Sequence, residues 1–429
     1  MAGMQGKESN IEGFAVKKDL PTEPITNSKD STEIPYAFSL NNLVLIVIDA
    51  LRTDFVTNNK SETNFPYLNK MLDEKKAISF NAKAHHPTVT LPRIKAITSG
   101  GIPGFMDVVF NFHSSEFEED NIVTQSVLNG KNVLFYGDGT WLRLFPHHFK
   151  RSEGTTSFFV SDYTEVDNNV TTNLNNELKR LDWDFLILHY LGLDHIGHKE
   201  GPFSALVPPK LREMDEVIER LHRELEHRDG SSMIVICGDH GMSDNGNHGG
   251  ASKEETSIPL IFIHNHKRFV NRSVVNVNQI SITPTLSVLL NLPLPKNNLG
   301  VILSDVLIDL KPREKLYAMF ANFYQMSKLK GDIEEFTQHG AVKMHQKWLE
   351  TFNSNQSYDD ISKQIEMYQR AINEFSEESS QNLIDQDLRL VLLGVFVVWM
   401  VAREQLLFIN YTVERHRVDI FNAVPTLKV

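Results

Sequence analysis

Three short apolar runs, each followed closely by an aspartate, restrict the fold of this chain more than any other feature. The runs cover residues 43–48, 185–190 and 233–237. Continuous apolar runs of this length are typical of strands that are covered on both faces of a sheet. Segments with helical periodicity lie between them, and strands that alternate with helices predict an α/β fold. We therefore expect a central, mostly parallel sheet flanked by helices.

The same patterns predict further elements along the chain. Apolar runs at residues 132–136 and 259–263 indicate two more strands. Segments whose apolar residues are spaced three and four positions apart indicate helices that bury one face. The expected helices cover residues 65–76, 92–99, 173–181, 210–228 and 282–290.

Composition divides the 429 residues into three regions. Residues 1–38 are polar, contain three prolines and show no apolar stretch of the signal-peptide type, so we expect a disordered leader. Residues 39–310 contain the alternation of strands and helices and form the expected α/β domain. Residues 311–429 have helical patterns without strand signals, which predicts a C-terminal helical region.

Residues 390–402 stand out within this helical region because they are apolar and uncharged. The stretch has 13 residues, whereas a helix needs roughly 20 apolar residues to cross a bilayer. Two interpretations stay open, namely a buried helix and a membrane-proximal hydrophobic helix.

Charge and cysteine content exclude several classes of function. Asp and Glu number 55 against 43 Lys and Arg, which gives a net charge of -12 and argues against nucleic-acid binding. Cys237 is the only cysteine in the sequence, so an intrachain disulfide is excluded and any zinc site must use His and acidic residues. Five Asn-x-Ser/Thr triplets are a mild indication of a luminal or extracellular protein. They begin at Asn59, Asn169, Asn271, Asn355 and Asn410.

Aspartate and histidine residues gather where the three apolar runs end. Because the carboxyl ends of parallel strands meet at one edge of a sheet, we expect these side chains to converge. Carboxylates and imidazoles are zinc ligands, and two-zinc sites bind the attacking and leaving oxygens of a phosphoryl group. The candidate ligands are Asp49, Asp194, His198, Asp239, His240 and His248.

Taken singly, these residues have simpler interpretations. An aspartate after a strand, such as Asp49, is commonly a turn or helix-cap residue, and we expect His195 to be a satisfied loop histidine. The paired histidines lack neighbouring carboxylates, and we expect them not to bind metal. They are His85, His86, His147 and His148. The joint occurrence of six ligand-type residues near strand ends favours a metal site over separate structural roles.

Residues 86–93 supply a candidate nucleophile. Thr90 precedes Pro92, which we expect to open a helix. A hydroxyl at a helix N-terminus lies near backbone N–H groups that stabilise negative charge, and a metal would make it a stronger nucleophile. The alternative is that Thr88 or Thr90 is simply an N-cap.

These motifs resemble those of the alkaline phosphatase superfamily. The similar segments are residues 47–52, 90–93, 192–198, 238–242 and 248–250. Two intervening segments look like those of a narrower group, the glycosylphosphatidylinositol (GPI) ethanolamine phosphate transferases. These are residues 137–141 and 160–167, within a resemblance that covers about residues 42–300.

The resemblance implies an alkaline-phosphatase-like catalytic domain that binds two zinc ions. The first zinc, which also touches Thr90, would be bound by Asp49, Asp239 and His240. The second would be bound by Asp194, His198 and His248. Thr90 would take phosphoethanolamine from phosphatidylethanolamine and pass it to a mannose of the GPI-anchor precursor. The chain departs from the family at Gly139, where the family has an acidic residue, and this affects one peripheral contact.

The resemblance also implies a location and partners. Members of the family are membrane enzymes of the endoplasmic reticulum, with a luminal catalytic domain and a small membrane partner subunit. They usually begin with a membrane anchor and end in many membrane spans, and in this sequence only residues 390–402 hint at such a span.

Two other functions are compatible with the motifs. A soluble nucleotide pyrophosphatase or phosphodiesterase of the same superfamily would share the metal ligands and differ in its substrate pocket. A truncated, inactive homologue would act as a binding or regulatory module. The presence of all six ligand-type residues and Thr90 argues against the inactive form.

Overall fold

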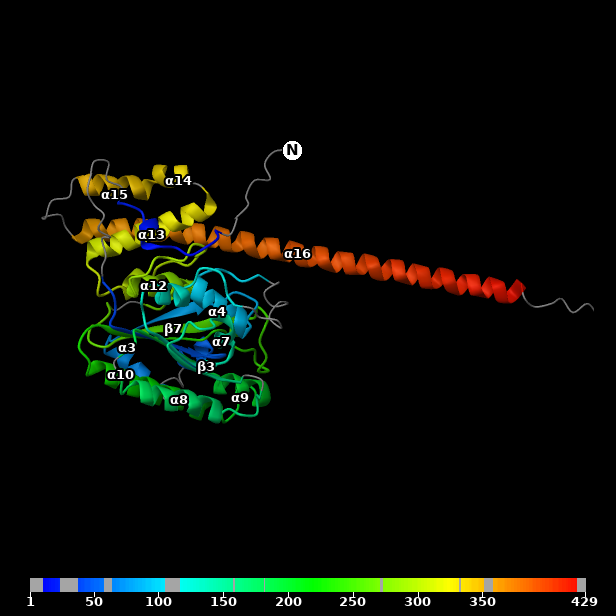
Figure 1. Ribbon diagram of the computed structural model, residues 1–429, viewed down its shortest axis with the longest axis horizontal. Coiled ribbons are helices and arrows are strands. Elements are labelled where there is room, and N and C mark those ends of the chain that lie inside the picture. The colour runs from blue at the N-terminus through cyan, green and yellow to red at the C-terminus, as the bar shows by residue number, and fades with distance from the viewer. Residues whose placement is uncertain are drawn as a thin grey trace, which may run out of the picture. The chain divides into compact units, whose positions relative to one another are not determined.

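The computed structural model describes residues 11–23, 38–57, 64–104, 116–156, 159–180, 182–270, 273–331, 333–350 and 358–422. The chain forms two compact units, Met1–Ser379 and Ser380–Val429. The predicted boundary near residue 310 does not coincide with the division between these units and stays a prediction. The first unit contains the sheet and is shown in Figure 1.

Within the described residues, eight strands form a single sheet in the order β4-β3-β5-β1-β6-β7-β2-β8. Every paired neighbour is parallel except β7, which runs antiparallel to both β6 and β2. The strands are β1 Asn42–Ile48, β2 Ala77–Lys83, β3 Val133–Asp138, β4 Arg151–Thr155, β5 Phe185–Tyr190, β6 Ser232–Cys237, β7 Ser257–His264 and β8 Val275–Asn278. The predicted mostly parallel sheet flanked by helices is confirmed.

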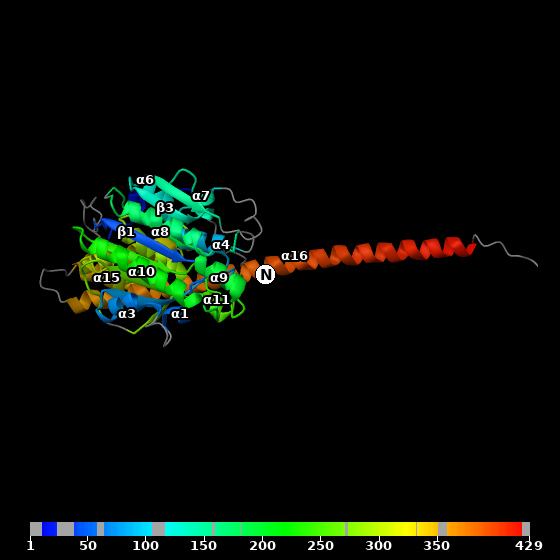
Figure 2. The same ribbon diagram turned by 90° about the horizontal axis from the view of Figure 1, so that it is seen from below.

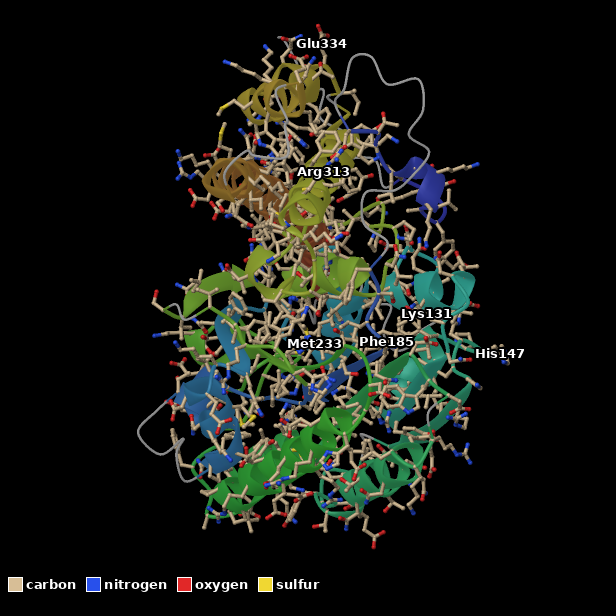
Figure 3. The ribbon with its side chains drawn as sticks, turned by 90° about the vertical axis from the view of Figure 1, so that its left-hand side faces the viewer. Lys131, His147, Phe185, Met233, Arg313 and Glu334 are labelled. Atoms are coloured by element: carbon tan, nitrogen blue, oxygen red, sulfur yellow. The ribbon has the colours of Figure 1, made fainter. Side chains whose placement is uncertain are left out.

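The apolar runs form strands because both faces of the sheet are covered. All seven residues of β1 are buried. Since successive side chains point to opposite faces, Leu43, Leu45 and Val47 enter one hydrophobic cluster, whereas Val44, Ile46 and Ile48 enter the other. Phe185 and Met233 begin the runs in β5 and β6 and lie in the interior of the molecule (Figure 3).

Helices cover the two faces in separate layers. One face is covered by α3 Pro66–Asp73, α8 Glu165–Glu177, α9 Gly192–Glu200 and α10 Val207–Glu226, which Figure 2 shows from below. The other face is covered by α4 Thr90–Ser99, α6 Ile122–Leu128 and α12 Ile282–Leu289. The short helices are α1 Thr53–Thr57, α7 Thr140–Leu144 and α11 Lys253–Thr256.

The predicted C-terminal helical region is present. Its helices are α13 Pro312–Lys330, α14 Ile333–Gln338, α15 Gly340–Glu350 and α16 Tyr358–Asn422. Tyr317 of α13 and Tyr368 of α16 belong to the same hydrophobic cluster as Leu286 of α12. Up to Ser379, this region therefore shares a core with one face of the sheet instead of forming an independent domain.

Residues 390–402 lie within α16, in the second unit. Their apolar side chains are exposed, as at Val398 (69% exposed) and Trp399 (55% exposed). Both interpretations of this stretch, the buried helix and the membrane-proximal helix, stay predictions. In the part of the chain that the structure describes, no helix combines the length and apolar character needed to span a membrane.

Part of the predicted disordered leader is ordered. Residues 11–23 contain the short 3-10 helix η1 Lys17–Asp19 and lie against the α/β domain. Backbone N–H of Ala15 donates to Asp120 (2.8 Å), and Gln125 donates to the Ala15 carbonyl (2.7 Å). For these residues the prediction of disorder is wrong, because buried backbone hydrogen bonds compensate for their polar composition. Residues 1–10 and 24–37 lie outside the described residues.

Candidate metal centre

The carboxyl ends of β5, β1 and β6 meet at one edge of the sheet because these neighbouring strands are parallel. Asp49 directly follows β1, and Asp239 follows β6 after one glycine. Helix α9 begins just beyond β5 and contains Asp194. The structure thus brings the three predicted strand-end carboxylates to the same edge.

The first group of candidate ligands is fully enclosed by protein. Asp49, Asp239 and His240 are 2%, 0% and 0% exposed, and their ligand atoms lie within 4.8 Å of one another. The Nε2 atom of His240 lies 3.5 Å from Oδ1 of Asp49 and 3.3 Å from Oδ2 of Asp239. Although Asp239 and His240 are adjacent in sequence, both face this group, as the resemblance implied.

Thr90 is the first residue of α4 and faces the first group. Its Oγ1 lies 3.4 Å from Oδ2 of Asp49 and 3.5 Å from Nε2 of His240. The N-cap of α4 is Val89, so the N-cap interpretation of Thr90 is wrong. The helix begins two residues before the predicted start at Pro92, because proline is compatible with any position in the first turn.

Thr88, the other candidate hydroxyl, has a structural role. Its Oγ1 donates to the Gly250 carbonyl (2.8 Å) and accepts from the Gly249 N–H (2.9 Å). These bonds attach the loop that contains His248 to the segment before α4. Thr90 is therefore the better candidate nucleophile.

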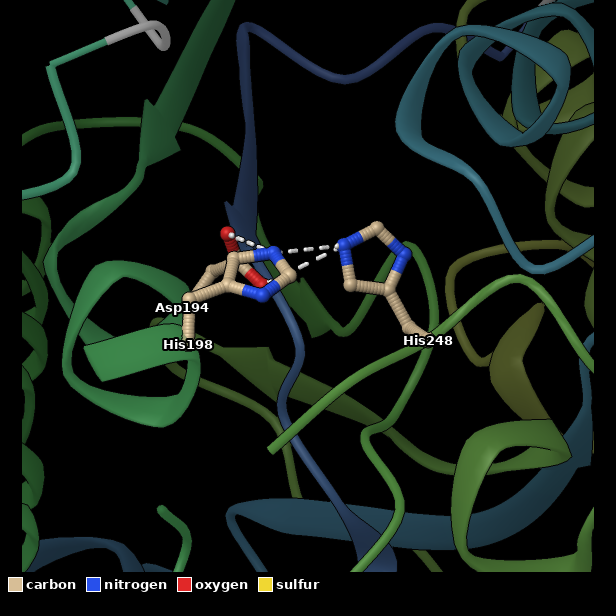
Figure 4. Close-up of side chains that lie close together, drawn as sticks. All are labelled: Asp194, His198 and His248. Carbon is tan, nitrogen blue, oxygen red and sulfur yellow. Dashed lines mark hydrogen bonds and ion pairs between the residues drawn. The ribbon is translucent and has the colours of Figure 1, made fainter. Parts of the chain in front are cut away.

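The second group combines helix α9 with this loop. Asp194 and His198 are four residues apart on α9 and face His248 (Figure 4). Nε2 of His198 lies 3.4 Å from Oδ2 of Asp194, and Nε2 of His248 lies 3.6 Å from Oδ1 of Asp194. His195, between these ligands, was expected to be a loop histidine, but the segment is helical, and the helical spacing places both ligands on one face.

The tautomers of His240 and His248 leave Nε2 unprotonated, so that Nε2 of His248 can accept from Nε2 of His198 (3.0 Å). Nδ1 of His240 lies 2.8 Å from the Gly241 carbonyl, and Nδ1 of His248 lies 2.8 Å from the Thr88 carbonyl. A carbonyl only accepts, so Nδ1 carries the proton and Nε2 keeps its lone pair. This is the arrangement in which histidine binds a metal through Nε2 while a carbonyl orients the ring.

The three carboxylates have oxygen atoms that are free to bind a metal. One buried oxygen of each acid has no hydrogen-bond partner in the described structure, namely Oδ1 of Asp49, Oδ1 of Asp194 and Oδ2 of Asp239. Buried polar atoms are rarely left without a partner. Each group could hold a cation between its carboxylate oxygens and imidazole nitrogens, and nitrogen and oxygen ligands of this kind fit zinc.

Electrostatics without a metal supports the same conclusion. Burial, together with the charges of neighbouring aspartates, raises the pKa of Asp49 and of Asp194 well above the ordinary value. Burial lowers the pKa of His240 and of His248 to about 3. The imidazoles are therefore neutral at physiological pH, as metal ligands must be. A divalent cation would relieve the repulsion among the carboxylates.

Helix α9 is fixed by a buried ion pair that sequence reasoning missed. Oδ1 of Asp167 accepts from the backbone N–H groups of Leu191 (2.9 Å) and Gly192 (3.1 Å), and its Oδ2 contacts Nζ of Lys210 (2.9 Å). A Cβ at Gly192 would lie 2.4 Å from Oδ2 of Asp167, so only glycine fits there. Asp167 ends the resembling segment 160–167, which was the available signal, but sequence alone did not indicate its partner.

The other predicted histidines behave differently from the ligands. Nδ1 of His195 lies 2.6 Å from the Asp162 carbonyl, and His195 belongs to neither group. Among the described residues, the four paired histidines are also outside both groups. Figure 3 shows His147 at the edge of the molecule.

Comparison with known proteins adds independent information. The type I phosphodiesterase / nucleotide pyrophosphatase family model matches residues 144–255. The catalytic subunit of GPI ethanolamine phosphate transferase 2 from Homo sapiens is 40% identical over 410 residues, which are 91% of this chain and 41% of that protein. GPI ethanolamine phosphate transferase 2 from Schizosaccharomyces pombe is 43% identical over 317 residues, covering 68% of this chain and 42% of that protein.

A solved structure is also similar. The integral membrane lipooligosaccharide phosphoethanolamine transferase A from Neisseria meningitidis is 15% identical, with a TM-score of 0.47 over 73% of this chain and 62% of that chain.

The predicted resemblance to the alkaline phosphatase-like superfamily is confirmed by the family model that matches residues 144–255. Within it, the chain is homologous to proteins named GPI ethanolamine phosphate transferase 2, so the predicted resemblance to that family is confirmed. The chain spans about two fifths of the length of these curated relatives (41% and 42% for the two above).

Proposed function

We propose that this chain carries the catalytic site of a zinc-dependent phosphoethanolamine transferase. The observation that carries the proposal is the set of buried carboxylate oxygens that face imidazole lone pairs in two groups, with a threonine hydroxyl beside the first. Asp49, Asp239 and His240 would bind one zinc ion. Asp194, His198 and His248 would bind the second. Zinc at such sites polarises phosphoryl oxygens and activates a bound hydroxyl as a nucleophile.

Thr90 is the proposed nucleophile. Its Oγ would attack the phosphorus of phosphatidylethanolamine, forming a Thr90–phosphorus bond and breaking the bond between phosphorus and the diacylglycerol oxygen, which takes the Thr90 proton. A mannose hydroxyl would then attack the same phosphorus and give its proton to Thr90, releasing the threonine. The N-terminus of α4 directs backbone N–H groups toward the negative charge that develops near Thr90.

The substrates, location and partner are proposed from the relatives. Their name indicates transfer of ethanolamine phosphate to GPI, and the acceptor would be a mannose of the GPI-anchor precursor. The donor would be phosphatidylethanolamine, and the catalytic domain would face the lumen of the endoplasmic reticulum. A small membrane subunit is the expected partner.

The decisive experiment combines metal analysis with two substrates. We expect the purified chain to contain two zinc ions and to transfer ethanolamine phosphate from labelled phosphatidylethanolamine to a mannosylated GPI precursor lipid. A chromogenic nucleotide phosphodiester should be hydrolysed slowly in comparison. Absence of transfer together with fast nucleotide hydrolysis would contradict the transferase assignment.

A nucleotide pyrophosphatase or phosphodiesterase is the second candidate, favoured by the family model that matches residues 144–255. The same two substrates distinguish it from the transferase. Absence of bound zinc and of both activities would instead identify an inactive homologue that acts as a binding module.

A further inference from the structure

His189 lies beside the first metal group but belongs to neither set of candidate ligands. It is the fifth residue of β5 and is completely buried. Its Nε2 lies 3.5 Å from Oδ2 of Asp49. Nε2 has no hydrogen-bond partner within the described structure, and Oδ2 of Asp49 is an acceptor that lies 3.5 Å away.

Trp141 determines which nitrogen of His189 carries that proton. The indole Nε1 of Trp141 lies 2.9 Å from Nδ1 of His189. An indole N–H can only donate a hydrogen bond, so Nδ1 of His189 must accept it and the proton of the neutral ring is on Nε2. This tautomer is the opposite of that in His240 and His248, whose Nδ1 atoms donate to carbonyl groups.

The segment that carries Trp141 is rigidly held against His189. Gly137 has φ +140°, and a Cβ there would lie 2.2 Å from the His189 carbonyl oxygen. Trp141 itself is fully buried and stacks on Phe135, with ring centroids 5.4 Å apart. Residues 137–141 resemble a family segment, yet none of the proposed metal ligands comes from it.

We propose that His189 is a positioning residue, which directs its Nε2 proton toward Oδ2 of Asp49 in the orientation and tautomer that Trp141 imposes. This inference rests on the proposed two-zinc centre. A donor at Oδ2 leaves Oδ1 of Asp49 for the metal, and Oδ1 is the buried oxygen without a partner, 3.5 Å from Nε2 of His240. Because the lone pair of His189 is engaged by Trp141, His189 is not a base for Thr90.

Two substitutions at position 189 separate the two ring nitrogens. A glutamine amide reaches about as far as Nε2, whereas an asparagine amide reaches only as far as Nδ1. We expect His189→Asn to lower the affinity for one of the two zinc ions by about tenfold to a hundredfold. This is the usual effect of losing a group that orients a metal ligand. The zinc affinity of His189→Gln should lie within about threefold of the wild-type affinity. Zinc affinity is measured by competition with a chelator in the purified full chain.

If His189→Asn binds zinc with the same affinity as the wild type, the proposal is wrong. An equal loss of zinc affinity in both variants would also contradict it, because packing alone would then explain the effect. Thermal unfolding of the metal-free variants checks that they fold. If the wild-type chain binds no zinc, the proposed function itself is wrong. If it binds two and His189→Asn is unaffected, only this inference is wrong.

Trp141→Phe tests the source of the tautomer, and Trp183→Phe is its matched control. Trp183 is also buried (2% exposed), but its indole N–H donates to the Glu177 carbonyl (3.3 Å) instead of to a histidine. We expect Trp141→Phe to lower the affinity for one zinc ion by about tenfold, and Trp183→Phe to leave zinc affinity unchanged. Imidazole 15N chemical shifts of the metal-free chain should place the His189 proton on Nε2 in the wild type and on a mixture of both nitrogens in Trp141→Phe. An Nδ1 proton in the wild type would refute the proposal.

Discussion

The two candidate metal groups differ in how much protein surrounds them. The side chains of Asp49, Asp239 and His240 in the first group are at most 2% exposed. In the second group, the side chains of His198 and His248 are 29% and 14% exposed. The first group is built at the ends of β1 and β6, whereas the second joins helix α9 to a loop.

This difference suggests a division of tasks within the proposed centre. The proposed nucleophile Thr90 contacts two ligands of the first group, Asp49 and His240, where burial keeps water away and strengthens electrostatic interactions. The second group opens to solvent, so a lipid phosphate and the acceptor hydroxyl would approach from its side. Imidazole rings connect the groups, because His240 and His248 stack with centroids 4.0 Å apart.

Removal of the nucleophile should have the largest effect on activity. We expect Thr90→Ala to lower the transfer rate by about a thousandfold or more, because a covalent nucleophile has no substitute in its mechanism. Both zinc ions should remain bound, since Thr90 is not required for either ligand set. Rates are compared under single-turnover conditions with labelled phosphatidylethanolamine.

Thr98→Ala is the matched control for Thr90→Ala. Thr98 is a buried threonine of the same helix α4, and its Oγ1 donates to the Ile94 carbonyl (2.8 Å). This variant should retain most of the activity. Unchanged transfer in Thr90→Ala would exclude Thr90 and make Thr88 the next hydroxyl to test.

Removing one carboxylate ligand should weaken zinc binding at one group and leave the other group unaffected. Asp239→Asn is expected to weaken zinc at the first group by more than about a hundredfold, since a lost ligand exceeds the effect of a lost supporting residue. Asp194→Asn should do the same at the second group only. Zinc content after dialysis should fall from two to one in each variant. Asp215→Asn is the control. It changes a buried carboxylate that accepts hydrogen bonds from the backbone N–H groups of Tyr67 and Leu68, and this variant should keep both zinc ions.

Much of this edge could be predicted from the sequence. The apolar runs before Asp49 and Asp239 identified the strands, and the parallel arrangement then required their ends to meet. For β5 the predicted limits match the observed Phe185–Tyr190. The six candidate ligands and Thr90 are all found at the edge where they were expected, although their roles as ligands and nucleophile stay proposals.

Other features depend on tertiary contacts that a sequence pattern does not contain. Strand β2 was not predicted, because Asn81 and Lys83 interrupt its apolar pattern and pairing with β7 and β8 stabilises it. Helix α8 begins at Glu165, eight residues before the predicted start, because its polar first turn lacks an apolar face until it packs on the sheet. The contact of His189 with Trp141 joins residues 48 positions apart and has no local signal.

Acidification should weaken zinc binding at both groups through the carboxylates. Because the pKa of Asp49 and of Asp194 is raised by burial, a proton competes with zinc at higher pH than at an ordinary aspartate. The imidazoles of His240 and His248, with pKa lowered to about 3, do not compete until much lower pH. We expect affinity to fall by up to about tenfold per pH unit for each proton taken up as the pH is lowered from neutral. Zinc titrations over a series of decreasing pH values measure the slope, which Asp49→Asn should reduce at the first group, and a flat profile in the wild type would contradict this account.

The smallest expected effect concerns the loop that completes the second group. Gly246 has φ +79°, and a Cβ there would lie 1.9 Å from the Gly197 carbonyl oxygen of α9. Gly246→Ala should therefore push the His248 loop away from α9 and weaken only the second zinc, by about tenfold, which corresponds to about 1.4 kcal/mol. Gly331→Ala is the control, because Gly331 has φ +77° and no neighbouring atom within 4 Å. It introduces the same backbone strain of about 1–2 kcal/mol without the collision, so it should lower the unfolding free energy and leave zinc affinity unchanged. If Gly246→Ala also left the affinity for the second zinc ion unchanged, the close approach of the loop to α9 would not determine the geometry of the second group.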